Sequence, residues 1–228
     1  MALIQNAKGR RENQSPSGCT RLFGIPLLGN LISKIQGASI SAGTELEKLI
    51  MERVNKIDNL DDFLTRTLSD GEDKIFVATK KQVKQSQKIN SQYEPDFLGF
   101  NPHKRICYIV EVKDGDQFDT KKASGEHTTL HNFTNDISSE LPYSTAIYLC
   151  SFNARTKKEI YDGLKHKFSM EEILTGQELC DLFGIDYDEI IKIRTADQQT
   201  NLEYFIKEIL HIPEIKNMII GLLKNSKD

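Results

Sequence analysis

One stretch decides the fold of this 228-residue chain, the nine residues Arg105-Ile-Cys-Tyr-Ile-Val-Glu-Val-Lys113. Its β-branched and aromatic residues are typical of a buried strand, and the Asp114-Gly115 pair that follows is typical of a turn. A strand points successive side chains to opposite faces, so Glu111 and Lys113 share one face while Val112 points to the other. Because charged groups are costly at the end of a buried strand, Glu111 and Lys113 need a partner or a ligand there.

Three more strands are expected around this stretch. The first, Lys74-Ile-Phe-Val-Ala-Thr79, follows an Asp70-Gly71 turn, and the others cover 95–100 and 144–152. The segment 80–88 is polar and basic, and no element is expected there. Apolar residues at helical spacing predict helices over 22–36, 44–57, 59–68 and 123–140, and then over 156–165, 169–174, 175–184, 186–194, 201–211 and 214–225. This order predicts an α/β (α+β) fold, with a mixed central sheet flanked by helices and a helical C-terminal part.

The chain divides into three expected segments. Residues 1–18 are polar and predict a flexible basic arm, whose Arg10 and Arg11 either reach DNA or form a solvated tail. Residues 19–152 form the core that carries the chemistry. Residues 153–228 form a helical region that serves packing, dimerisation or DNA contact.

Composition excludes several classes of protein. The sequence has 28% charged and 38% hydrophobic residues, as soluble globular proteins do, and it lacks the roughly 20-residue apolar run of a membrane span. No signal peptide is evident, so a cytoplasmic location without a membrane partner is expected. The four cysteines form no CxxC pair, and no phosphate-binding glycine motif occurs. With a net charge of −3, DNA binding requires a local basic surface.

The ends of two expected strands carry groups that suit phosphodiester hydrolysis. Pro95-Asp96 begins one strand and Glu111-Val112-Lys113 ends the next, so antiparallel pairing brings both to one edge of the sheet. Mg²⁺ prefers oxygen ligands, which the Asp96 and Glu111 carboxylates and the Val112 carbonyl would provide. Lys113 would then lie beside the attacking water or the scissile phosphate.

Context makes this motif specific. An acid-x-Lys triplet also occurs at Glu72-Asp-Lys74, Asp119-Thr-Lys121 and Glu214-Ile-Lys216. Only Glu111-Val-Lys113 ends a hydrophobic strand and follows the chain's Pro-Asp pair at hairpin distance.

Pro95-Asp96, followed after fourteen residues by Glu111-Val112-Lys113, resembles the PD-(D/E)xK nuclease superfamily. The helix containing Gly43-Thr-Glu-Leu-Glu47 and the strand at 144–152 match the αβββαβ core order of that restriction-endonuclease-like fold. The segment 114–122 with Glu126 looks like the part that follows the motif in type II restriction endonucleases.

The resemblance implies Mg²⁺-dependent hydrolysis of phosphodiester bonds in double-stranded DNA at a short, palindromic sequence. Asp96 and Glu111 would bind the metal and Lys113 would be the catalytic lysine. Glu47 on the first core helix would join the site, with Glu45 as its rival, or else would only close a capping box with Thr44.

Partners follow from the same reading. A small chain with one active site predicts a homodimer, with one site for each DNA strand. A restriction enzyme also implies a cognate DNA methyltransferase in the same host.

Basic residues near the motif are candidates for DNA contact, the alternative being a solvated surface. Those assigned to DNA are Lys80, Lys81, Lys121, Lys122 and Arg155. Asp116 and Asp119 either bind a second cation or form a solvated turn. His127 and His131 have the i,i+4 spacing of a metal-binding pair, but no third ligand is evident.

Two other functions stay open. One is a PD-(D/E)xK nuclease of DNA repair, recombination or transposition that acts on DNA structure. The other is a DNA- or protein-binding module without catalysis, in which the acidic strand ends are incidental.

Overall fold

The computed structural model describes residues 2–9, 18–65, 73–115 and 120–225. Arg10, Arg11, Asp116, Asp119 and the Asp70-Gly71 turn therefore lie outside the described residues. The chain forms two compact units, one of residues 47–188 and one of 1–46 with 189–228. The expected division at 18 and 152 and the roles of its three segments stay predictions.

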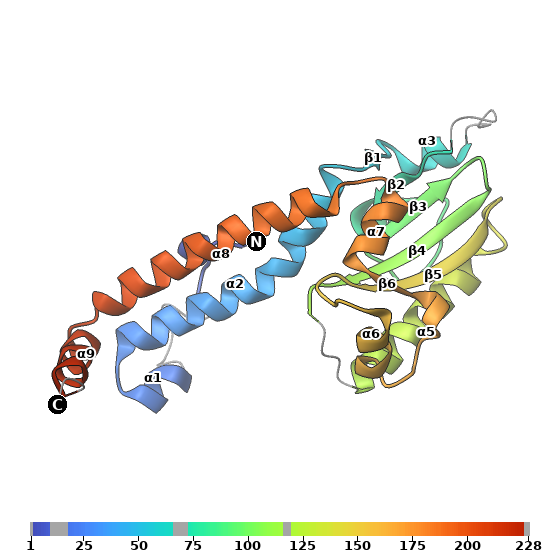
Figure 1. Cartoon of the computed structure of the whole chain (residues 1–228). Helices are drawn as coiled ribbons and strands as arrows, with labels where there is room; N and C mark the ends of the chain where they lie inside the picture. The colour runs from blue at the N-terminus through green and yellow to red at the C-terminus, as the bar shows by residue number, and fades with distance from the viewer. Residues whose placement is uncertain (1, 10–17, 66–72, 116–119, 226–228) are drawn as a thin grey trace. The chain divides into compact units, whose positions relative to one another are not determined.

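A six-stranded mixed sheet forms the centre of the unit 47–188 (Figure 1). Its spatial order follows the sequence, from β1 to β6. The β2–β3 and β3–β4 pairs are antiparallel, and the other three pairs are parallel. The strands are β1 (Asn55–Lys56), β2 (Phe76–Thr79), β3 (Phe97–Asn101), β4 (Ile106–Lys113), β5 (Ser144–Ser151) and β6 (Ile173–Thr175). The expected mixed α/β fold is thus confirmed.

Two of these strands were not expected from the sequence. β6 lies where a helix was expected over 169–174, and β1 lies within the helix expected over 44–57. Each has at most three residues, too few to show a period of two. β6 exists because it pairs with Leu149–Ser151 of β5, which is a tertiary effect that local sequence does not encode.

Helices cover both faces of the sheet. The described helices of this unit are α3 (Leu60–Thr65), α4 (Lys80–Gln85), α5 (Thr120–Ile137), α6 (Lys157–Gly163), η2 (Met170–Glu172) and α7 (Gly176–Phe183). α4 was missed in the polar segment 80–88, although Thr79 and Gln82 form a complete capping box at its start. The Phe183 ring of α7 meets Phe97 of β3 edge-on, with their centroids 6.1 Å apart.

The hydrophobic core lies between the sheet and α5. The α5 side chains at helical spacing, Leu130, Phe133 and Ile137, are fully buried, as the sequence predicts. They belong to one buried cluster with Phe100 of β3 and Ile109 of β4. Cys107 and Ile109 thus face α5, and strand alternation turns Glu111 and Lys113 to the same face.

Removing Phe133 tests this core. Phe133→Ala should lower the free energy of unfolding by about 3–5 kcal/mol, because it removes a fully buried ring and leaves a cavity. Thr128→Ala changes an exposed residue of the same helix and should have little effect. Urea unfolding of both variants measures the difference, and equal stability would show that α5 does not cover the core.

The second unit is helical. It contains η1 (Ile4–Asn6), α1 (Gly18–Phe23), α9 (Pro213–Asn225) and most of α2 (Pro26–Met51) and α8 (Tyr187–Leu210). The Ile4 N–H donates to Asn201 Oδ1 at 2.7 Å, and Asn201 Nδ2 donates to the Ala2 carbonyl at 3.1 Å. These bonds connect the first residues of the chain to α8.

Helix lengths were underestimated in this part of the sequence. The helices expected over 22–36 and 44–57 are one helix, α2, because Leu31, Ala38, Ala42 and Leu46 continue the same buried face. Likewise, 186–194 and 201–211 belong to the continuous α8. Thr44 and Glu47 lie inside α2, so the capping-box reading of this pair was wrong.

None of the helices in the described ranges combines the length and apolar character needed to cross a lipid bilayer.

Candidate active site

The predicted meeting of the two strand ends is confirmed. β3 and β4 are antiparallel with Phe97 opposite Val110, so Asp96 and Glu111 follow at the same end of the pair. The Val112 N–H donates to Asp96 Oδ2 at 2.9 Å, which fixes the Asp96 carboxylate against β4. Asp96, Glu111 and Lys113 therefore lie together on the face of the sheet that α5 covers.

Lys113 is held between two carboxylates. Its Nζ lies 2.6 Å from Glu111 Oε1 and 2.7 Å from Glu126 Oε1 of α5. Glu126 was noted in the sequence but received no role there. Its place in the site follows from the packing of α5 on the sheet face that carries Lys113, and no local motif shows it.

Burial makes the carboxylates costly to ionise. Asp96 and Glu111 are each only 8% exposed. Burial, and then repulsion from Asp96, raises the pKa of Glu111 to about 7. Burial also raises the pKa of Asp96, with the negative charge of Glu47 acting in the same direction. The site thus concentrates acidic groups that resist carrying charge together.

For Lys113, in contrast, the surroundings favour the charged form. Burial by itself would lower its pKa, but the charges and hydrogen bonds of Glu111 and Glu126 outweigh burial and raise the pKa. The lysine is therefore a firmly held cation at neutral pH. In this arrangement it donates hydrogen bonds and offers positive charge, and it does not offer a free amine.

Glu47 approaches the same group of charges from α2. Its half-buried carboxyl has a raised pKa, caused first by burial and next by the charge of Glu111. The positive charge of Lys80 opposes this shift in Glu47 and also in Asp96. Glu47 and Lys80 are thus part of the electrostatic environment of Asp96 and Glu111.

The residues predicted to contact DNA differ in how directly the structure connects them to the site. The Lys80 N–H donates to the Asp96 carbonyl at 3.0 Å, which brings the start of α4 to the site. Lys81 follows it and is exposed. Lys121 is exposed on α5, and Arg155 is exposed just before α6. The Lys122 side chain lies outside the description.

The donor set fits a hard divalent cation. Asp96, Glu111 and Glu47 carry carboxylates and Val112 carries a carbonyl at the same strand end, and oxygen ligands of this kind are the ones that Mg²⁺ prefers. The raised pKa values of Asp96 and Glu111 come first from burial, and the negative charge of Asp96 adds to the shift of Glu111 while that of Glu47 adds to the shift of Asp96. A divalent cation bound by these carboxylates would relieve both effects. The positive charge of Lys113 beside these carboxylates could then face a phosphate.

Similarity to a known protein covers nearly the whole chain. The chain is 42% identical over 225 residues to the protein named Type II restriction enzyme HhaII of Haemophilus parahaemolyticus. The aligned region spans 96% of this chain and 98% of that protein. No family model and no solved structure matches the chain.

Proposed function

The chain belongs to the type II restriction enzymes, and from this membership we propose that it cuts double-stranded DNA at a short palindromic sequence with the help of Mg²⁺. It is a site-specific deoxyribonuclease. We assign its core to the PD-(D/E)xK nucleases, on the basis of Pro95-Asp96, Glu111-Val112-Lys113 and the strand pairing that joins them. The observation that carries this assignment is a buried carboxylate pair beside a charged lysine.

Asp96, Glu111 and the Val112 carbonyl are the proposed holders of the metal, with Glu47 joining them. When bound, Mg²⁺ activates water and neutralises charge on the scissile phosphate. The water oxygen bonds to phosphorus as the P–O3′ bond breaks, the water gives up a proton to solvent and O3′ takes one from solvent, which leaves a 5′ phosphate and a 3′ hydroxyl. Lys113 orients the water and, through its positive charge, stabilises the negative phosphate oxygens.

The basic residues around the site are the proposed DNA contacts. Lys80 and Lys81 stand at the start of α4, and the Lys80 backbone is bonded to Asp96. Lys121, Lys122 and Arg155 complete the proposed set. Such contacts fix the position of the backbone and do not read its sequence. A cognate DNA methyltransferase that protects the host DNA, and a cytoplasmic location, complete this proposal.

Cleavage of plasmid and phage DNA tests the proposal. The purified chain should give discrete fragments with Mg²⁺ and none with EDTA, and Asp96→Asn should be inactive under both conditions. Asp73→Asn is the matched control, because Asp73 pairs with Lys104 and Asn101 outside the site. Intact DNA on several unmodified substrates would contradict the proposal, and cleavage of branched DNA alone would identify a structure-selective nuclease.

We also propose that the enzyme is a homodimer, formed through its helical unit. Eleven of the twelve large hydrophobic residues that the structure describes as exposed belong to this unit. Three of them, Leu202, Ile206 and Leu210, form an apolar stripe along α8 at intervals of four residues. The other eight are Leu22, Phe23, Leu27, Ile40, Met218, Ile220, Leu222 and Leu223.

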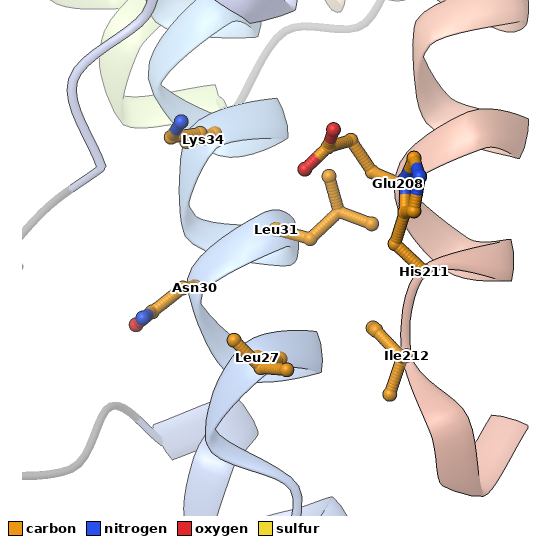
Figure 2. Close-up of a pocket in the computed structure, with 7 residues that line it drawn as sticks. All are labelled: Leu27, Asn30, Leu31, Lys34, Glu208, His211 and Ile212. Atoms are coloured by element: carbon orange, nitrogen blue, oxygen red, sulfur yellow. The ribbon is translucent and has the colours of Figure 1, made fainter.

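A pocket of about 320 Å³ lies in the same unit, where Leu27, Leu31 and Ile212 supply apolar walls (Figure 2). Apolar surface of this extent in a soluble chain marks an interaction site. A second copy suits it because a palindrome presents two identical half-sites, so a two-fold dimer places one active site on each strand.

Charge on the α8 stripe should separate the protomers. The wild-type chain should have twice the 26.0 kDa chain mass by light scattering, and the double variant Leu202→Lys, Ile206→Lys should be monomeric. Thr200→Lys places a single lysine at an exposed α8 position away from the stripe and should leave the dimer intact. A monomeric wild-type chain would refute the dimer, and a dimeric double variant would locate the interface elsewhere.

A further inference from the structure

Two histidines of α5 lie against each other outside the active site. His127 and His131 are one helical turn apart, and their ring centroids are separated by 4.2 Å at an interplanar angle of 48°. Phe168, which is buried, meets the His127 ring edge-on at 5.0 Å. The pair is therefore held in place on one side by the core and is accessible on the other.

Glu172 supplies the third group that the sequence did not reveal. Its Oε1 lies 3.4 Å from His131 Nε2, although the two residues are far apart in the chain. Its other oxygen accepts a hydrogen bond from the Ser169 N–H at 2.8 Å, as part of the capping box of η2. The carboxylate is thus oriented by its own turn, with one oxygen left for the histidines.

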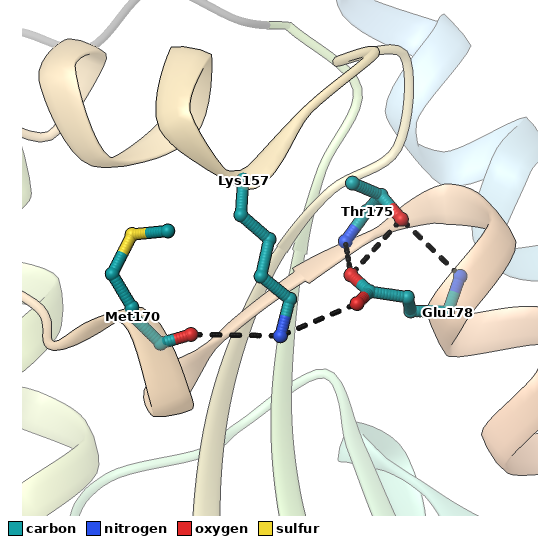
Figure 3. A network of polar contacts seen from close by, with 4 residues as sticks. All are labelled: Lys157, Met170, Thr175 and Glu178. Atoms are coloured by element: carbon teal, nitrogen blue, oxygen red, sulfur yellow. Dashed lines mark hydrogen bonds and ion pairs between the residues drawn. The ribbon is translucent and has the colours of Figure 1, made fainter.

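The η2 turn is itself anchored. Lys157 Nζ donates to the Met170 carbonyl at 3.5 Å and lies 3.3 Å from Glu178 Oε1 (Figure 3). Glu178 in turn accepts from the Thr175 N–H at 2.9 Å in the capping box of α7. These contacts link the turn that carries Glu172 to both neighbouring helices, so Glu172 stands at a defined position.

The three side chains have the spacing of a metal site. One ligand atom from each of His127, His131 and Glu172 lies within 4.8 Å of the others. A tetrahedral ion with bonds of roughly 2.1 Å needs its ligand atoms about 3.4 Å apart. The His131–Glu172 distance already has this value, and the ligand atoms of the other two pairs lie within 4.8 Å, a distance that an ion would have to shorten by side-chain rotation.

The chemistry of the pair also favours a shared cation. His131 Nε2 is buried and makes no hydrogen bond within the described part of the chain, and it faces a carboxylate oxygen. The two atoms thus lie 3.4 Å apart without a hydrogen bond between them, and a cation bound between them would serve both.

We propose that His127, His131 and Glu172 form a binding site for a divalent transition-metal ion of the zinc type, separate from the carboxylates of the active site. Two imidazoles and one carboxylate are the donors that such ions prefer, with water in the fourth position. The bound ion joins α5 to the turn that precedes β6. Because α5 also carries Glu126, the site stiffens the helix that holds a partner of Lys113.

Titration calorimetry with Zn²⁺ tests the site on the full chain, in the presence of excess Mg²⁺ to occupy the active-site carboxylates. The wild-type chain should bind one Zn²⁺ and melt at a higher temperature with it. His131→Gln and Glu172→Gln should each weaken binding by more than about tenfold. Glutamine at 172 keeps an oxygen that can accept from the Ser169 N–H, so the turn is preserved.

His166→Ala is the matched control, because His166 also lies beside a carboxylate, Asp162, at 3.3 Å but belongs to no three-ligand cluster in the described residues. This variant and Asp96→Asn should bind Zn²⁺ as the wild type does. Melting in EDTA checks that every variant is folded. The proposal would be overturned if the wild type bound no Zn²⁺, or if both glutamine variants bound Zn²⁺ as tightly as the wild type. Either result would count whatever the outcome of the DNA cleavage assay.

Discussion

Replacement of Glu111 by glutamine is expected to abolish cleavage and yet to stabilise the metal-free protein. Loss of a proposed metal ligand should reduce the cleavage rate at least about a thousandfold, since metal catalysis contributes several kcal/mol. The amide removes a buried charge that lies against Asp96 and keeps an oxygen for Lys113. At pH 8 and without metal, the variant should be more stable than the wild type by roughly 2 kcal/mol.

The stability difference should depend on pH in a fixed direction. The pKa of Glu111 rises from 4.5 to about 7 on folding, so between these values the folded state binds more protons than the unfolded one. Its contribution to stability is therefore fully present below pH 4.5 and is lost as the pH rises through about 7. Urea unfolding in EDTA should show little difference between the two proteins at pH 5 and a clear one at pH 8. A wild-type chain that is the more stable at pH 8 would contradict this electrostatic description.

Replacement of Lys113 by alanine should abolish cleavage as well, but with the opposite effect on stability. The change leaves Glu111 and Glu126 without the cation that lies within 2.7 Å of both. An uncompensated buried charge is strongly destabilising, so we expect a loss of about 2 kcal/mol or more at pH 8 without metal. The cleavage rate should fall at least about a thousandfold, because the phosphate loses its positively charged partner.

Lys104→Ala is the matched control for this variant. Lys104 forms an ion pair of 2.9 Å with Asp73, but both groups are exposed, so its loss should cost little stability and no activity. Thermal melting in EDTA and a cleavage assay with Mg²⁺ measure both effects. Full activity in Lys113→Ala would show that another residue supplies the charge at the phosphate.

The sequence predicts the centre of the site because the relevant geometry is local. The alternation of β4 puts Glu111 and Lys113 on one face, and one antiparallel pairing brings Asp96 beside them. Both inferences need only a period of two and a hairpin. The mixed sheet and the buried face of α5 follow from equally local patterns.

Residues that reach a site through tertiary packing were not predictable in the same way. Glu126 meets Lys113 because α5 crosses the sheet, and Glu172 meets His131 because η2 packs near α5. No sequence period relates these pairs. The same limit explains β6, which is defined by its neighbour β5, and the two long helices, whose middle turns contain few large apolar residues.

The double ion pair of Lys113 has a consequence for the order in which ligands bind. In the metal-free protein Lys113 forms an ion pair with Glu111 Oε1, so a metal ion must compete with Lys113 for that oxygen. A DNA phosphate offers the lysine an alternative partner and thereby frees Glu111. Mg²⁺ and DNA should accordingly bind with positive cooperativity, each tightening the other by the same factor. Without DNA the enzyme should then bind Mg²⁺ only weakly, so the active site is completed only after DNA has bound.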